Sequence, residues 1–306
     1  MNTPVKPAAD IGKGLFHTPF WLAPEKNVFA NRSTRFKELA DAEHSGWRDY
    51  LNLLAAVCAA QQAVADGRDI AAPARGQGKT VLPEAGQGGV PSEFFAVFTA
   101  LLDEVQGKIP AAAAQETERL KKLGRADAEV LAGRVLAGST QADDRAAEIW
   151  VQAALQIVWT AWAGRLNEND VPPTEADTRT HCPCCGSEAV GSVVLIRSDL
   201  NGFRYMHCPL CNSRWNVLRA KCPTCGDAGA MRIQQFEGPD GLPPAYAAAN
   251  AESCNACRTY RKLYRQDKQQ YADPVADDLA TLGLDIMVGE AGYERGGANP
   301  FLLAEE

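Results

Sequence analysis

The chain has 306 residues, of which 46% are hydrophobic and 23% are charged, a composition typical of globular proteins with one or two domains. Its net charge of -7 argues against a general binder of polyanions. The first residues lack the layout of a secretory signal, and the longest apolar run, residues 149–166, is too short and too interrupted to span a bilayer. We therefore expect a cytoplasmic protein, in which clustered cysteines are metal ligands or redox thiols rather than structural disulfides.

The cysteines are distributed unevenly along the chain. Cys58 stands alone in the first 180 residues, and the other nine lie between Cys182 and Cys257. Residues 171–180, with two prolines followed by polar residues, separate the two parts. The sequence thus predicts an α+β protein, with an N-terminal helical bundle followed by a tandem pair of rubredoxin-like or zinc-ribbon four-cysteine metal modules. The expected parts are an N-terminal segment (1–34), a helical domain (35–170), a first metal module (178–218), a second metal module (219–268), and a C-terminal helix and tail (269–306).

The helical domain is predicted from apolar residues at spacings of three and four. The helix expected last starts at Thr140, has acidic residues in its first turn, and is apolar nearly all round from Ile149 to Trp162. We expect it to be the central, buried helix, with its three tryptophans in the core rather than around a ligand. The expected helices cover residues 36–66, 91–107, 111–123, 125–138 and 140–163.

A Gly/Pro-rich loop between helices ends in RGQGKT, at residues 75–80, like a phosphate-binding loop. The motif requires a glycine where this chain has Pro73, and neither a strand before nor a helix after it is predicted. Nucleotide binding is therefore not expected. His17 and His44 lie far from any acid and nucleophile, so the helical half is predicted to be a scaffold or a binding surface without catalytic residues.

Beyond residue 182 the pattern changes to strands and turns, and it repeats with a period of about 40 residues. The first unit runs from CPCCG at residues 182–186, through the strands VGSVVLIR and FRYMH, to CPLC at 208–211. The second runs from CPTCG at 222–226, through the strand AMRIQQFE and a short extended AYAAA, to CNAC at 254–257. Each unit is a knuckle, a strand, a turn, a strand and a knuckle, followed by a basic and aromatic stretch.

Four CxxC knuckles predict two metal sites. Each knuckle presents two sulfurs to one ion, and a closed tetrahedral site needs two knuckles. An antiparallel hairpin returns the chain to its start, so the first knuckle should meet the second and the third the fourth, with an interleaved pairing as the alternative. Four thiolates suit zinc and mononuclear iron equally. The predicted ligands are Cys182, Cys185, Cys208 and Cys211 in one site and Cys222, Cys225, Cys254 and Cys257 in the other.

The first knuckle contains a third cysteine, Cys184, whose spacing does not match that of the other pairs. The residue before the second ligand of a knuckle usually points outward, so we expect Cys184 to be a free thiol beside the metal. It is either a chance cysteine on a turn or a reactive thiol with a redox or sulfur-relay role.

Charge is also distributed unevenly. Residues 178–268 contain 12 Lys or Arg and 7 Asp or Glu, against 19 and 31 in the rest of the chain. The basic residues after the last knuckle form either a face that grips a protein or nucleic acid, or a solvated strand face. They are Arg258, Arg261, Lys262, Arg265 and Lys268, with Tyr260 and Tyr264 among them. In the tail, Asp277, Asp278 and Asp285 are candidate ligands or partner contacts, although the first two more simply begin a helix.

The four-knuckle run HCPCCGSEAVGSVVLIRSDLNGFRYMHCPLCNSRWNVLRAKCPTCGD resembles the FdhE family of formate dehydrogenase maturation factors. The similarity extends to the tail YADPVADDLATLGLDIMVGEAGYERGGANPFLL and, more loosely, to FWLAPEKNVFANRSTRFKELA. It implies a cytoplasmic protein that binds the molybdenum-containing catalytic subunit of formate dehydrogenase before export. It also implies a tandem rubredoxin-like domain, with iron favoured as the metal. Cys184 departs from the plainer first knuckle expected for the family.

The leading hypothesis is therefore a maturation factor that is not an enzyme and that binds a formate dehydrogenase catalytic subunit. One alternative is an iron-rubredoxin-type redox protein or a sulfur relay through Cys184. The other is a nucleic-acid-binding zinc ribbon that uses the basic residues 258–268, which the negative net charge disfavours.

Overall fold

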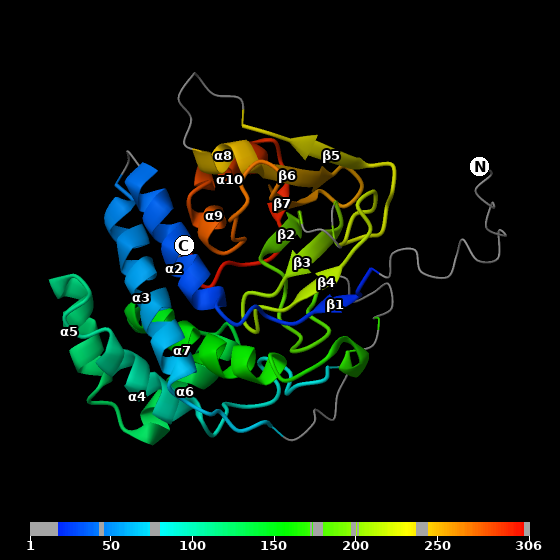
Figure 1. Cartoon of the computed structure of the whole chain (residues 1–306). Coiled ribbons are helices and arrows are strands. Elements are labelled where there is room, and N and C mark those ends of the chain that lie inside the picture. Colours follow the sequence, from blue (N-terminus) through cyan, green and yellow to red (C-terminus); the bar gives the residue numbers. More distant parts are fainter. Residues whose placement is uncertain are drawn as a thin grey trace, which may run out of the picture.

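The computed structural model of the chain describes residues 18–42, 46–73, 80–171, 173, 180–196, 200, 202–236 and 244–302 (Figure 1). His17, His44 and most of the RGQGKT loop lie outside these residues. In the part that is described, no helix combines the length and the apolar character needed to cross a membrane.

The first half of the described chain is helical. The prediction of one helix over residues 36–66 is wrong, because the chain turns at Gly46 and Trp47, where glycine weakens the helix. The first helix also begins earlier, since the apolar spacing already starts at Val28 and Phe29, which are both buried. The helices are α2 (Val28–Ala42), α3 (Arg48–Asp66), α4 (Phe94–Glu104), α5 (Ala111–Leu120), α6 (Arg125–Leu136) and α7 (Arg145–Ala163), with short 3-10 turns η1 (Ala142–Asp144) and η2 (Glu168–Asp170).

Helix α7 is the centre of the helical half. It contacts α3, α4, α5 and α6, and most of its side chains are buried. Trp150, Trp159 and Trp162 lie in the hydrophobic core as expected, and the two latter indoles donate hydrogen bonds to the carbonyl oxygens of Pro83 and Ala71. The tryptophans therefore pack the core and also fix the loop that follows α3.

Among the described residues, the strands form one sheet of eight, in the order β1-β4-β3-β2-β7-β6-β5 with β8 beside β7. Strands are antiparallel within each repeat, and the two repeats join through the parallel pair β2 and β7, where Ser192 lies opposite Leu263. The predicted modules thus share a continuous sheet. The strands are β1 (Trp21–Leu22), β2 (Gly191–Val194), β3 (Arg204–His207), β4 (Arg214–Asn216), β5 (Met231–Gln234), β6 (Ala249–Cys254), β7 (Thr259–Arg265) and β8 (Glu294–Arg295).

One short segment of the second repeat differs from the prediction. The run AYAAA, expected to be extended, lies mainly in helix α8 (Pro244–Ala248), and the strand β6 begins only at Ala249. The high helix propensity of alanine accounts for the difference.

The C-terminal part places α9 (Ala276–Leu279) and α10 (Leu282–Glu290) on the sheet. Figure 1 shows α9, in orange, between the blue helix α2 and the strands. Arg35 of α2 pairs with Asp277 of α9, and Lys262 of β7 pairs with Asp278, so this short helix joins the two halves of the molecule.

Candidate metal centres

The eight cysteines predicted as ligands lie in two groups of four. Within each group, the sulfur atoms all lie within 4.8 Å of one another, a separation that allows one metal ion to bind all four. The first knuckle meets the second and the third meets the fourth, as the hairpin argument predicts, and not in the interleaved arrangement. We name them the first cluster (Cys182, Cys185, Cys208 and Cys211) and the second cluster (Cys222, Cys225, Cys254 and Cys257).

The two clusters are built from the same backbone turns. Gly186 and Gly226 follow the second cysteine of their knuckles with φ of 80° and 79°, which explains why glycine stands there. Their N–H groups donate to the carbonyl oxygens of Cys182 and Cys222, at 2.8 and 2.9 Å. Each turn therefore closes in the same way around its pair of sulfurs.

The last knuckle of each repeat has a left-handed residue directly after its second cysteine. Asn212 has φ of 57° and Arg258 has φ of 58°, an uncommon conformation outside glycine. A hydroxyl follows one residue later, and it lies 3.0 Å from the Cys211 sulfur in Ser213 and 3.1 Å from the Cys257 sulfur in Thr259. The repeated sequence thus produces a repeated geometry around both groups of thiols.

The first cluster is enclosed between the helices and the sheet. All four of its cysteines are buried, and they belong to the main hydrophobic core. The loop before α4 crosses the first knuckle, where the N–H groups of Leu82 and Ala85 donate to the carbonyl oxygens of Cys184 and Cys185 at 2.9 Å. On the other side, Gln156 of α7 donates to the Pro209 carbonyl at 2.8 Å.

Asn212 links the first cluster to two helices. Its amide donates to the Thr160 hydroxyl of α7 at 2.8 Å, and its carbonyl oxygen accepts from the Arg32 guanidinium of α2 at 2.7 Å. The side chain next to Cys211 therefore ties this cluster directly to the helical half.

Cys184 is placed differently from the prediction. Its side chain is fully buried and does not point outward, because the loop at Leu82 covers the first knuckle. It lies beside the first cluster but is not one of the four cysteines whose sulfurs converge. A reactive role for Cys184 would need this loop to move.

The second cluster lies nearer the surface. Cys222 and Cys254 are buried, whereas Cys257 is partly exposed and Cys225 is exposed. The contacts around it come from its own repeat and from the tail: the Arg258 guanidinium donates to the carbonyl oxygens of Ala291 and Gly292 and stacks on Tyr293, 4.0 Å from the ring centroid. The two clusters thus share their turns but not their surroundings.

Most of the basic and aromatic stretch after the last knuckle is neither a gripping surface nor a solvated strand face, although Arg258 and Lys268 at its two ends are exposed. Most of it forms β7, a central strand whose residues Tyr260 to Tyr264 are all buried. Arg261 pairs with Glu188, and Lys262 pairs with Asp278 and Asp285. The pattern looked like a surface because its acidic partners lie elsewhere in the sequence.

The tail aspartates serve these ion pairs. Asp277 and Asp278 do stand in the first turn of a helix, α9, as expected. Both are fully buried, Asp277 against Arg35 and Asp278 against Lys262 and Arg295. Their charges are therefore paired with cations of the chain itself.

A buried polar network next to the first cluster was not predicted. Arg32 donates to the Asp273 carboxylate at 2.9 Å and lies 3.3 Å from the His207 ring. Burial, together with the charge of Arg214, lowers the pKa of His207 to about 3. Burial alone would raise the pKa of Asp273, but the neighbouring Arg32 charge lowers it to about 2. No local sequence pattern marks these residues, because they come from α2, β3 and the segment after β7.

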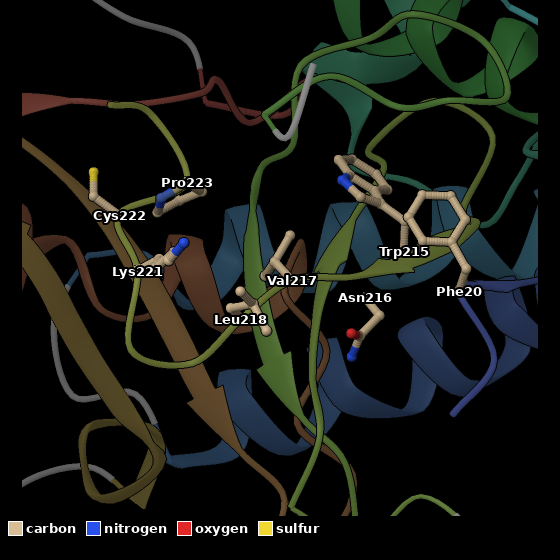
Figure 2. A pocket seen from close by; sticks show the side chains of 8 residues that line it. All are labelled: Phe20, Trp215, Asn216, Val217, Leu218, Lys221, Cys222 and Pro223. Carbon is tan, nitrogen blue, oxygen red and sulfur yellow. The ribbon is translucent and has the colours of Figure 1, made fainter. Parts of the chain in front are cut away.

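One hollow adjoins the second cluster and another adjoins the buried polar network. A small one of about 110 Å³ lies beside the second cluster, and Figure 2 shows Phe20 and Trp215 at one side of it and Lys221, Cys222 and Pro223 at the other. A larger cleft of about 520 Å³ runs between α2, the start of β4 and residues 266–273. The cleft mixes charged and apolar side chains, including Arg35, Asp273 and Tyr271.

Comparisons with known proteins agree with this architecture. Sequence profiles of the FdhE family match residues 18–175 (FdhE, N-terminal), 181–219 (FdhE, central domain) and 220–302 (FdhE, C-terminal domain). A protein named Protein FdhE homolog from Haemophilus influenzae is 32% identical over 93% of this chain and 91% of its own length. One from Edwardsiella ictaluri is 34% identical over 94% and 92%. The crystal structure of the FdhE protein from Pseudomonas aeruginosa matches with a TM-score of 0.76 and 30% identity, covering 93% of this chain and 99% of that one.

Proposed function

Because this chain belongs to the FdhE family, we propose that it is a formate dehydrogenase accessory protein that binds the molybdenum-containing catalytic subunit in the cytoplasm and is needed for its activity. The observation that carries the proposal is the similarity over the helical part and both cysteine repeats, at 30% or more identity. The proposal therefore rests on similarity along most of the chain rather than on one motif.

A role without catalysis is part of the proposal. Several buried charged groups outside the clusters are held in ion pairs that connect distant segments, such as Arg35 with Asp277 and Lys262 with Asp278. Such pairs position elements of the fold, whereas a catalytic group must reach a substrate. The chemistry available near the surface is that of the second cluster.

We further propose that each cluster binds one metal ion through its four thiolates. The converging sulfurs fit a tetrahedral ion such as iron or zinc, and the family resemblance favours iron. Metal analysis and an absorption spectrum of protein purified without air test this directly. Ferric centres with four thiolates are coloured and zinc centres are not, so a colourless protein with two zinc ions would remove iron from the proposal.

The accessory role is tested in cells that make a tagged formate dehydrogenase catalytic subunit and lack their own copy of this protein. We expect the chain to copurify with the subunit and to restore formate dehydrogenase activity. A matched variant, Asp127→Asn at an exposed position of α6, should behave like the unchanged protein. Full activity without the chain, together with no recoverable complex, would refute the proposal.

The basic stretch no longer favours the nucleic-acid alternative, since Arg261 and Lys262 are buried in ion pairs. The iron-rubredoxin alternative requires iron in the clusters. The absorption spectrum that identifies the ion therefore also tests this alternative.

A further inference from the structure

We propose that the two clusters differ in metal exchange: the second holds an ion that external thiol or amine ligands can remove, whereas the first holds an ion that leaves only when the helices and the sheet separate. This rests on the proposal above that both clusters bind metal. It assigns different rates of metal exchange to two sites that are both built from CxxC knuckles.

The difference does not come from the knuckles themselves. Gly186 and Gly226 adopt the same conformation, and so do Asn212 and Arg258. The sulfur–sulfur distances between facing knuckles are also similar, 3.5 Å for Cys185 and Cys208 in the first cluster and 3.7 Å in the second. The thiolates alone should therefore bind an ion with comparable strength, and any difference in exchange must arise outside the turns.

Access to the first cluster is blocked by chain segments on two sides. The loop at Leu82 and Ala85 is hydrogen-bonded to the first knuckle, and the Cβ of an alanine at position 186 would lie 2.8 Å from a carbon of Glu84. Helix α7 holds the facing knuckle through Gln156. An incoming ligand can reach this ion only after these contacts break, which links exchange to a costly local opening.

The second cluster lacks such a cover at Cys225. That side chain is exposed and its neighbour Cys257 is partly exposed, although Cys222 and Cys254 are as buried as their counterparts. The strand nearest in sequence, β5, lies at the end of the sheet order, and its Ile233 is 66% exposed. Thiolates that are partly exposed react, whereas buried structural ones are inert.

Exchange at the second cluster begins at Cys225. In the metal-loaded chain, the bond between the ion and the Cys225 sulfur would break as a bond to a nitrogen or sulfur of the incoming ligand forms, with no change in the oxidation state of the ion. The freed thiolate turns into water or takes up a proton from it. The other three ligands, the partly exposed Cys257 and the buried Cys222 and Cys254, would release the ion in later steps.

The test uses the full chain loaded with two zinc ions, mixed with the chelator 4-(2-pyridylazo)resorcinol and, in parallel, with N-ethylmaleimide. We expect one ion to leave at least about tenfold faster than the other, because only the first cluster requires local opening. During the fast phase, peptide mass spectrometry should find label on Cys222, Cys225, Cys254 and Cys257, while Cys182, Cys184, Cys185, Cys208 and Cys211 stay unlabelled.

The matched variants are Cys225→Ser and Cys185→Ser, which occupy equivalent positions of the two clusters. Cys225→Ser should accelerate the fast phase and leave the slow phase unchanged. Equal release rates, or label appearing first on the first cluster, would overturn the inference in the unchanged protein even if a variant does not fold. A chain that cannot be loaded with two ions would instead refute the metal proposal itself.

Discussion

Arg35 of α2 and Asp277 of α9 form a buried ion pair, 242 positions apart in the sequence, with the guanidinium and carboxylate in contact at 2.6 Å. A second nitrogen of Arg35 donates to the other carboxylate oxygen at 3.0 Å, so the contact is bidentate. It connects the first helix to the tail, which in turn lies on the central strand β7.

We expect Arg35→Met or Asp277→Asn to lower the free energy of unfolding by about 3–5 kcal/mol, because either change leaves a buried charged or polar group without its partner. The double variant Arg35→Met/Asp277→Asn should cost clearly less than the sum of the two single changes. Urea unfolding followed by circular dichroism measures all three. Single variants that lose less than about 1 kcal/mol would show that the pair has no structural role.

Cys58 gives a prediction for alkaline pH. Burial, partly offset by the Arg32 charge, raises the pKa of its thiol from 9.0 to about 12. A raised pKa in the folded state means that this contribution to stability is fully present below pH 9 and is lost as the pH rises toward 12. Between pH 8 and 10, the unchanged chain should lose about 1.4 kcal/mol relative to Cys58→Ala. The readout is the difference between the two proteins in the slope of the unfolding free energy against pH. Parallel curves would contradict the raised pKa of Cys58.

The two clusters can be removed separately. Replacing Cys222 and Cys225 by serine should leave one bound metal ion per chain and a nearly unchanged helical circular dichroism signal, because the helices have their own core. Replacing Cys182 and Cys185 should also leave one ion but should weaken the helices, since the first cluster is part of that core. Metal analysis and thermal unfolding distinguish the two. Two retained ions in either variant would disprove the grouping of ligands.

Gly186 tests the loop that covers the first cluster. Gly186 has φ of 80°, so Gly186→Ala should lower the free energy of unfolding by about 1–2 kcal/mol from backbone strain alone. An added Cβ would also lie 2.8 Å from a side-chain carbon of Glu84, and the flexible end of that side chain can move. We therefore expect Glu84→Ala to recover a measurable part of the loss in the double variant. No recovery in thermal unfolding would mean that Glu84 does not press on the knuckle.

The sequence predicted local features and missed those that depend on distant neighbours. The spacing of the knuckles was sufficient to group eight cysteines correctly in space, because a hairpin is a local structure. The same local reasoning wrongly predicted that Cys184 points outward. The loop at Leu82 that covers it comes from a distant part of the sequence and cannot be read from the residues around Cys184. Lys262 was predicted to be exposed for the same reason: its partners Asp278 and Asp285 come later in the sequence, in α9 and α10.

The joining of the repeats through β2 and β7 sets the order in which the sheet can be completed. Strand β2 pairs with β3 in a hairpin close in sequence, but its other edge stays open until β7 is made, and β7 itself needs the tail for Lys262. Contacts between distant segments form slowly and leave strand edges unpaired meanwhile. During synthesis, the helices can assemble early, whereas the unfinished sheet keeps an edge that can pair with other chains until β7 and Asp278 have emerged from the ribosome.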